Sequence, residues 1–238
     1  MKKTLLAFVM ALFSGVVVKA QEKRFDFGFN LYPNYSIGIL SSNGSIPAGF
    51  ESSFRELETW KPSVSASIFV EYKLNERSIL GFGIGYQNNG VRTVKQELFP
   101  QYDPSMGDPI IDPSLPSQVR FVYNHHNIEV PLYYRHVFGT RFFLLAGISG
   151  IINVSNTSTS VAYFSEGNEI RNKQFDNSTA FRRLNFSGNL GFGLDYLKTD
   201  RISLYVLPFA QYAFLGVSKT AALNRNHLSI GLSTGIRL

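Results

Sequence analysis

Apolar and polar side chains alternate with a period of two along many segments of this chain. In the C-terminal segment one row holds Leu228, Ile230, Leu232, Thr234, Ile236 and Leu238, and the row between them holds Ser229, Gly231, Ser233, Gly235 and Arg237. Successive side chains of a β-strand point to opposite faces, so the pattern predicts strands with one apolar and one hydrophilic face. The hydrophilic row is too polar for the inner layer of a sandwich, whereas lipid outside and a polar lumen inside suit both rows. We therefore expect an all-β transmembrane β-barrel.

Eight segments show this alternation, and each spans the roughly 9–11 residues that a tilted strand needs to cross the hydrocarbon core. The outward rows before the C-terminal one are Phe25, Phe27, Phe29 and Leu31; Val64, Ala66, Ile68, Val70 and Tyr72; Leu80, Phe82, Ile84 and Tyr86; Ile128, Val130, Leu132 and Tyr134; Phe142, Leu144, Ala146, Ile148 and Ile152; Leu184, Phe186, Leu190, Phe192, Leu194 and Tyr196; and Ile202, Leu204, Val206, Ala210, Tyr212 and Phe214. The prediction is an eight-stranded antiparallel up-and-down barrel.

The connections between these segments alternate in length. Short ones at 75–77, 138–140 and 199–201 alternate with long ones at about 41–59, 95–118 and 156–181, and a shorter one lies near 219–224. Outer-membrane barrels have short periplasmic turns and long external loops, so we expect both termini in the periplasm. Pro131 and Pro208 fall inside predicted strands, and each is expected to cause a bulge or local break because proline cannot donate a ladder hydrogen bond.

The first twenty residues have the form of a secretory signal peptide. A basic start at Lys2 and Lys3 is followed by an apolar run and a small-residue cleavage site that ends at Ala20. We expect residues 1–20 to be cleaved. Residues 21–238 then form one outer-membrane β-barrel domain, a normal size for a single all-β unit.

Composition narrows the classes of function. The chain has no cysteine, which excludes disulfides, thiolate metal sites, cysteine nucleophiles and a lipid-anchored cysteine. The formal charge is +6, and Lys2, Lys3 and Lys19 of the predicted signal peptide account for three of these charges, which leaves +3 for the mature chain. That charge is too mild to indicate nucleic acid as a partner. Phe and Tyr are abundant while Trp occurs only at Trp60, a composition that suits strands and aromatic girdles.

One predicted hairpin is distinctive in its letters. Residues 126–135 have the sequence His-Asn-Ile-Glu-Val-Pro-Leu-Tyr-Tyr-Arg, and Phe-Leu-Leu-Ala-Gly follows after a turn at residues 143–147. An apolar-acidic-apolar-Pro-Leu strand before such an Ala-Gly strand resembles the PorT-like outer-membrane β-barrel family. The resemblance implies an eight-stranded barrel in the outer membrane of a Gram-negative bacterium, and the founding member is linked to a protein secretion system. The chain ends in Leu238, where many outer-membrane proteins end in Phe.

Eight strands enclose an interior just wide enough for side chains to fill, so the inward rows decide what the lumen can do. Seven charged residues point inward by alternation toward the periplasmic half: Asp26, Glu71, Lys73, Glu129, Arg135, Asp195 and Arg237. An unpaired charge is costly in a narrow lumen, so we predict ion pairs, such as Glu129 or Glu71 with Arg135 or Arg237. This network either plugs and staples the barrel or gates a path for ions or a small solute.

The inward positions become small and neutral toward the outer half: Ser65, Ser67, Gly83, Gly85, Ser149, Asn185, Ser187, Asn189, Gly191 and Gly193. These residues predict a shallow water-filled vestibule that opens to the outside. Phe69, Phe143, Tyr205 and Phe209 are expected to close it lower down.

His125, His126 and Glu129 suggest a metal site or a His/Ser/acid triad like that of lipid-modifying barrels. Adjacent histidines on a strand point to opposite faces, so they cannot hold one ion without a bulge. The serines show no nucleophile-elbow context, and only His126 shares a face with the lipid-directed row. We expect interfacial, solvated histidines, no catalysis and no cofactor or metal.

Two further groups of charges lie in the predicted loops. Asp103, Asp108 and Asp112 are each followed by proline, and their spacing does not match a calcium-binding loop. The basic residues near the outer rim are suited to lipopolysaccharide phosphates: Arg92, Lys95, Arg120, Arg171, Lys173, Arg182 and Arg183. A comparable set borders the periplasmic side: Arg77, Arg141, Lys198 and Arg201.

These features favour a small outer-membrane barrel with a structural or binding role that acts through its external loops. A narrow channel for ions or small solutes and an accessory factor in protein secretion are the alternatives. The expected partners are outer-membrane lipid and lipopolysaccharide, the barrel-assembly machinery during insertion, and a protein or small solute at the external loops.

Overall fold

The structure is a computed structural model, and it describes residues 24–42, 44–98, 101–102, 109–110, 115–176, 180–199, 201–219 and 222–238. The predicted signal peptide and the loop aspartates Asp103, Asp108 and Asp112 lie outside these ranges. Within the described ranges, no helix combines the length and hydropathy of a membrane-crossing segment.

The chain is almost entirely β-structure. Its strands are β1 (Phe25–Ser42), β2 (Glu58–Thr59), β3 (Lys61–Lys73), β4 (Ser78–Thr93), β5 (Gln96–Glu97), β6 (Gln101–Tyr102), β7 (Pro109–Ile110), β8 (Gln118–Phe138), β9 (Phe142–Tyr163), β10 (Glu169–Phe175), β11 (Leu184–Lys198), β12 (Ser203–Ala213) and β13 (Leu223–Arg237), with one helix described, α2 (Ala48–Leu57). The all-β prediction is confirmed.

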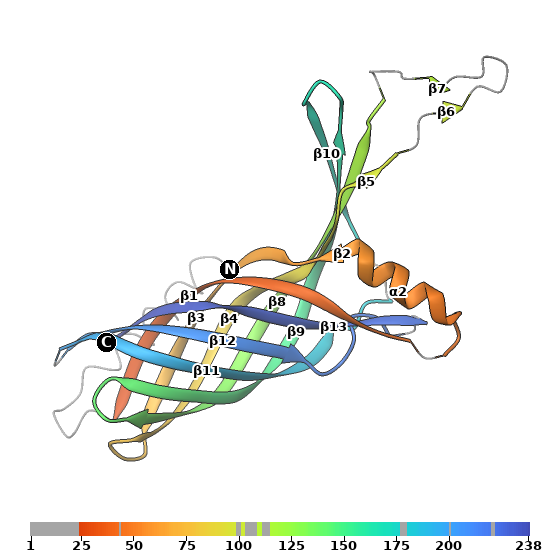
Figure 1. The fold of residues 1–238 in the computed structure, drawn as a ribbon. Helices are drawn as coiled ribbons and strands as arrows, with labels where there is room; N and C mark the ends of the chain where they lie inside the picture. Colours follow the sequence, from red (N-terminus) through yellow and green to blue (C-terminus); the bar gives the residue numbers. More distant parts are fainter. Residues whose placement is uncertain are drawn as a thin grey trace, which may run out of the picture.

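The long strands pair in chain order and close on themselves. β1 pairs with β3, and the series continues through β4, β8, β9, β11, β12 and β13, which pairs back with β1. Every one of these pairings is antiparallel. Figure 1 shows the resulting ring, with the short turns and the C-terminus at one end and α2 at the other. Because each long strand pairs with a neighbour on both sides, the ring has no free sheet edge along these pairings.

The apolar rows face outward from this ring, and the polar rows face inward. Ile68, Phe82 and Ile230 are exposed, whereas Ser65, Ser187 and Ser229 are buried. This arrangement is the inverse of a water-soluble β-barrel, in which the apolar rows fill the interior. The predicted direction of the rows is confirmed.

The sheet has eleven strands rather than the predicted eight. β2, β5 and β10 are the additional strands, and all three lie in segments that were predicted as loops. β8 and β9 are also longer than predicted. Their far ends and β10 form an extension that projects beyond the ring (Figure 1). The predicted loop at 41–59 contains α2, which begins after Pro47 and carries a Glu51–Arg55 pair at 2.6 Å.

Pro131 and Pro208 each interrupt one of their two ladders. The β4–β8 pairing stops between Phe82–Leu132 and Gly85–Glu129, and the β11–β12 pairing stops between Gly191–Phe209 and Leu194–Val206, both without a change of register. The predicted local breaks are therefore present. The register shifts lie elsewhere, at His126/Asn127 and Asp195/Leu197.

The short turns follow from their sequences. The Asn75 side-chain oxygen accepts hydrogen bonds from the backbone N–H groups of Arg77 and Ser78, at 2.9 and 2.8 Å, which closes the β3–β4 turn. Gly139 adopts a φ of 60° in the β8–β9 turn, a left-handed conformation that costs glycine little. These turns confirm the predicted short connections at one end of the ring.

Candidate functional site in the lumen of the strand ring

Four of the seven predicted lumen charges form one buried cluster. A carboxylate oxygen of Glu71 lies 2.5 Å from Arg135 and 3.3 Å from Arg237, and Arg237 lies 2.5 Å from Asp195. The side chains of this cluster are nearly inaccessible to solvent. Two acids and two bases therefore neutralise one another inside the ring, which offsets part of the cost of burying four charges.

Aromatic rings surround this cluster. The Tyr133 hydroxyl donates a hydrogen bond to Glu71 at 3.1 Å. The Arg237 guanidinium lies 3.9 Å from the centre of the Tyr205 ring and 4.9 Å from that of Phe143, so both rings make cation–π contacts with it. Ion pairs and rings together fill the lumen toward the end that carries the short turns.

Glycines on neighbouring strands make room for these rings. A Cβ atom on Gly81 would collide with the Tyr133 ring, and one on Gly193 would collide with the Phe143 ring. Gly193 was one of the small inward residues that predicted open space, and it instead accommodates a large side chain from the adjacent strand.

Asp26 and Lys73 form a separate pair near the strand ends. Lys73 Nζ lies 2.9 Å from a carboxylate oxygen of Asp26, and 40% of the Lys73 side chain is exposed. The pair lies beside water and outside the buried cluster, so its contribution to stability is expected to be small.

Glu129 does not pair with Arg135 or Arg237, in contrast to one of the predicted pairings. Its carboxylate accepts hydrogen bonds from the Tyr32 hydroxyl at 3.0 Å and from Gln211 Nε2 at 2.7 Å. It is buried, and it lines a cavity of about 90 Å³ that also reaches Glu71 and Arg237. The cluster at Glu71 lies at the other side of this cavity, which is why the arginines satisfy Glu71 and leave Glu129 to neutral donors.

Tyr32, Tyr133 and Gln211 are functional lumen residues that the sequence analysis did not single out. Each lies on an inward row, so alternation alone would have placed it inside the ring. Their hydrogen bonds to acids depend on which positions face each other across the lumen, and the period of two carries no information about that.

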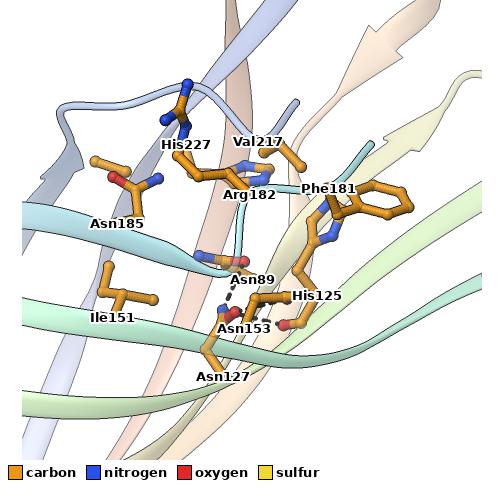
Figure 2. A pocket seen from close by; sticks show the side chains of 11 residues that line it. Asn89, His125, Asn127, Ile151, Asn153, Phe181, Arg182, Asn185, Val217 and His227 are labelled. Carbon is orange, nitrogen blue, oxygen red and sulfur yellow. Dashed lines mark hydrogen bonds between the residues drawn. The ribbon is translucent and has the colours of Figure 1, made fainter. Parts of the chain in front are cut away.

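A second pocket, of about 30 Å³, lies at the end of the lumen away from the short turns, where His125 and His227 face each other with ring centroids 5.1 Å apart (Figure 2). Both histidines are buried. The expectation of solvated histidines is therefore wrong for His125, because β8 turns its side chain into the ring. His126 points outward, and its Nδ1 shares a 2.5 Å hydrogen bond with the Tyr86 hydroxyl.

A chain of asparagines supports the floor of this pocket. Asn127 donates to Asn89 at 3.3 Å, Asn153 donates to Asn127 at 2.9 Å, and Asn153 and Asn156 exchange hydrogen bonds at 3.0 and 2.9 Å. Figure 2 shows Asn89, Asn127 and Asn153 below the two imidazoles. Instead of an open vestibule, the outer half thus holds a mutually bonded polar layer with a small pocket above it.

The predicted basic residues of the outer rim separate into two groups. Arg171 pairs with Glu169 at 2.6 Å, and Arg182 donates to the carbonyl oxygen of Gly216 at 3.2 Å. Arg92, Arg120 and Lys173 share one face with Arg171. Arg92 lies opposite Val122, which connects through Thr159 to Lys173, and Arg120 connects through Val161 to Arg171. Within the described part of the chain, the Nε atoms of Arg92 and Arg120 are buried without a hydrogen-bond partner.

Comparison with known proteins identifies the family. No curated protein matches this chain. Among solved structures, Neisserial surface protein A is 13% identical over 90% of this chain and 96% of its own, with a TM-score of 0.40. Ail of Yersinia pestis is 7% identical over 88% and 97%, at 0.38, and OprG of Pseudomonas aeruginosa is 12% identical over 88% and 95%, at 0.32. The family model described as outer membrane protein beta-barrel domain matches residues 19–220. The chain therefore belongs to the outer membrane protein beta-barrel domain family, whose members reside in the Gram-negative outer membrane.

Proposed function

We propose that the ring of β1, β3, β4, β8, β9, β11, β12 and β13 is an eight-stranded transmembrane barrel with a plugged lumen, and that the protein acts as a structural or binding component of the outer membrane. The observation that carries the proposal is the reversed burial pattern: exposed apolar rows outside, and buried ion pairs and hydrogen-bonded amides inside. In hydrocarbon every backbone group must be paired, and a closed ring satisfies this requirement.

The proposed orientation puts the short turns and the C-terminus in the periplasm. The described N-terminal strand also begins at that end, because Phe25 lies opposite Tyr72 near the β3–β4 turn. α2 and the β8–β9–β10 hairpin then lie outside the cell, where external loops of such barrels are long. Insertion in this orientation requires the barrel-assembly machinery of the outer membrane.

A plugged lumen predicts that the purified protein does not conduct. The cluster of Glu71, Arg135, Asp195 and Arg237 fills the lumen at the periplasmic end, so hydrated ions have no path. In planar lipid bilayers we expect no current steps above the background of protein-free detergent. Regular unitary steps from heat-modifiable, folded protein would contradict the plug.

A narrow cation channel is the second candidate, and Glu129 is the observation that favours it. This carboxylate is buried beside the 90 Å³ cavity, and its hydrogen-bond partners are neutral. A negative charge at that depth would select cations. If unitary current steps are recorded, a cation channel predicts that Glu129→Gln lowers their selectivity for cations over anions. Asp26→Asn, near the strand ends, is the control and should leave this selectivity unchanged.

We propose that the outward basic residues Arg92, Arg120 and Lys173 contact phosphates and other acidic groups of lipopolysaccharide. They lie on the same face as Tyr86, further toward the external end of the strands. Their guanidinium and ammonium groups therefore sit above the lipid-facing rows, at the level of the lipopolysaccharide head groups.

The triple variant Arg92→Gln, Arg120→Gln, Lys173→Gln is expected to retain less lipopolysaccharide after detergent extraction, because each basic side chain near an anionic surface contributes about 1 kcal/mol. The measurement is the mass ratio of lipopolysaccharide to protein after gel filtration. The matched control neutralises Arg77, Arg141 and Arg201 at the other end. Equal loss from both triple variants would show that general charge, and not the outward basic face, holds the lipid.

The proposal includes no catalytic role. The serines show no nucleophile-elbow context, and His126, the histidine on the face of the lipid-directed row, shares a hydrogen bond with the Tyr86 hydroxyl. The resemblance of residues 126–147 to PorT-like proteins adds an accessory role in protein secretion as a further candidate. Deletion of the gene followed by comparison of the secreted proteins tests that role.

A further inference from the structure

Two histidines from distant strands meet at the outer end of the lumen. His125 comes from β8 and His227 from β13, and β1, β3 and β4 lie between these strands in the ring. The two side chains line the same 30 Å³ pocket, and their ring centroids are 5.1 Å apart. Figure 2 shows them on facing sides of that pocket. The volume is enough for an ion with about one water.

The hydrogen bonds of Asn156 fix the tautomer of His125. Asn156 Oδ1 accepts a hydrogen bond from Asn153 at 3.0 Å, so the atom that lies 2.6 Å from His125 Nδ1 is an acceptor. His125 Nδ1 must therefore carry the proton, and Nε2 carries the lone pair. An oxygen that holds one imidazole nitrogen while the other is free to ligate is the usual outer-shell arrangement of metal-binding histidines.

His227 is the less satisfied member of the pair. It is 5% exposed, and its ring nitrogens have no side-chain hydrogen-bond partner among the described residues, whereas the backbone of Ile37 interacts with the ring. A neutral imidazole carries one N–H and one lone pair, so a single bond to a backbone carbonyl oxygen leaves the lone pair open. A buried polar atom without a partner costs about 1–3 kcal/mol, so a ligand that engages this lone pair is favoured.

We propose that His125 and His227 together bind one divalent transition-metal ion, with the one water that the pocket can hold as a further ligand. Imidazole suits Cu²⁺, Ni²⁺ and Zn²⁺, and Cu²⁺ binds tightest in this series. Ligand bonds of about 2.0–2.1 Å place two imidazole rings on one ion at about the centroid separation that is present here. The site spans the lumen, so the ion would cross-link β8 to β13. The proposal is independent of whether the barrel conducts.

Nearby charges set the affinity and the selectivity of the site. Lys61 and Arg225 act electrostatically on both imidazoles, and Arg182, a third cation, lines the pocket itself, so all three oppose a bound cation. Arg225 lies 2.6 Å from Glu58, which balances its charge, whereas Lys61 Nζ donates to Ser63 and Asn88. The described lining of the pocket contains no carboxylate. Hard cations such as Ca²⁺ and Mg²⁺, which prefer several oxygen ligands, are therefore excluded.

The test uses the folded full-length protein in detergent and titrates it with Cu²⁺ and with Ni²⁺, followed by calorimetry and by electron paramagnetic resonance of the copper. We expect one ion per chain and nitrogen hyperfine structure from imidazole. His125→Ala and His227→Ala should each weaken binding at least about tenfold, and their combination should remove the nitrogen signal. His126→Ala and His136→Ala are matched controls and should bind as the unmodified protein does.

Two further variants keep both ligands. Asn156→Ala removes the oxygen that orients His125 and should weaken binding about 10- to 100-fold. Lys61→Gln removes positive charge and should tighten binding. Folding of each variant is checked on a gel, on which a folded protein of this kind migrates differently before and after boiling. If a histidine variant does not fold, the Asn156 and Lys61 variants still test the site. The site is refuted if folded protein binds no ion, if either His125→Ala or His227→Ala binds normally, or if His126→Ala abolishes binding.

Discussion

Replacement of Glu71 by glutamine is expected to lower the free energy of unfolding by about 3–5 kcal/mol, the cost of breaking a buried ion pair by removing one partner. Glu71 is 1% exposed and lies between Arg135 and Arg237. Glutamine keeps the shape and an acceptor oxygen, so the loss measures charge rather than packing. Two buried guanidinium groups would remain with Asp195 as their only acid within the cluster.

The measurement is equilibrium unfolding by guanidinium in lipid vesicles, followed by the fluorescence of Trp60, the only tryptophan in the sequence. The control is Asp26→Asn, which breaks the solvent-exposed pair with Lys73 and is expected to cost about 0–1 kcal/mol. If both variants lose the same stability, the buried cluster does not hold the strand ring together.

An arginine placed on the outward face is expected to destabilise the protein in a depth-dependent way. Ile68 is 56% exposed at the middle of β3, and Ile68→Arg should cost about 2–4 kcal/mol, because the charge would enter the hydrocarbon core. Leu74 is 52% exposed in the turn after β3, and Leu74→Arg should cost about 0–1 kcal/mol.

These two positions are equally exposed on the isolated chain, so in water both substitutions would be nearly neutral. A difference between them therefore reports the surrounding lipid. Equal and small costs for Ile68→Arg and Leu74→Arg, measured by the same unfolding assay in vesicles, would place the Ile68 row outside the bilayer core.

The direction of each strand face could be predicted from the sequence because the signal is local. Ser65 and Ile68 stand at an odd and an even position of β3, so they point to opposite faces of the strand, and one is polar while the other is apolar. Polarity along the sequence therefore indicates which face is buried inside the ring. The short turns were also predictable, since Asn75 and Gly139 are residues that such turns need. The strand faces and the short turns could therefore be predicted from stretches of about ten neighbouring residues.

The contacts across the lumen could not be predicted in the same way. Glu129 and Arg135 lie on the same strand, about 20 Å apart, so they could not pair with each other. Their partners on other strands depend on the stagger between strands, which brings Glu71 and not Glu129 to the arginines. The meeting of His125 and His227 depends on that same stagger. Each residue type was visible, but its neighbour was not.

The strands outside the ring were missed for a different reason. The distal half of β9 is rich in Ser, Thr and Asn, and β10 holds four charged or amide side chains between Glu169 and Phe175, so neither strand shows a continuous apolar row. Backbone pairing continues there from β8 and β9 into a hairpin that projects from the ring (Figure 1). Helix α2 lies between two strands in a segment that was interpreted as a loop, although Phe50, Phe54 and Leu57 recur at helical spacing.

The direction of the apolar rows is tested most directly by single cysteines along β13, because the chain has no cysteine of its own. Spin labels at Ile230 and Leu232, in protein inserted in vesicles, should collide with lipid-soluble oxygen, whereas labels at Ser229 and Ser233 should be shielded from it. A period of two in oxygen accessibility, with maxima at the even positions, is the predicted result. Maxima at Ser229 and Ser233, or free access of a water-soluble relaxation agent to Ile230 and Leu232, would contradict a lipid-facing apolar row.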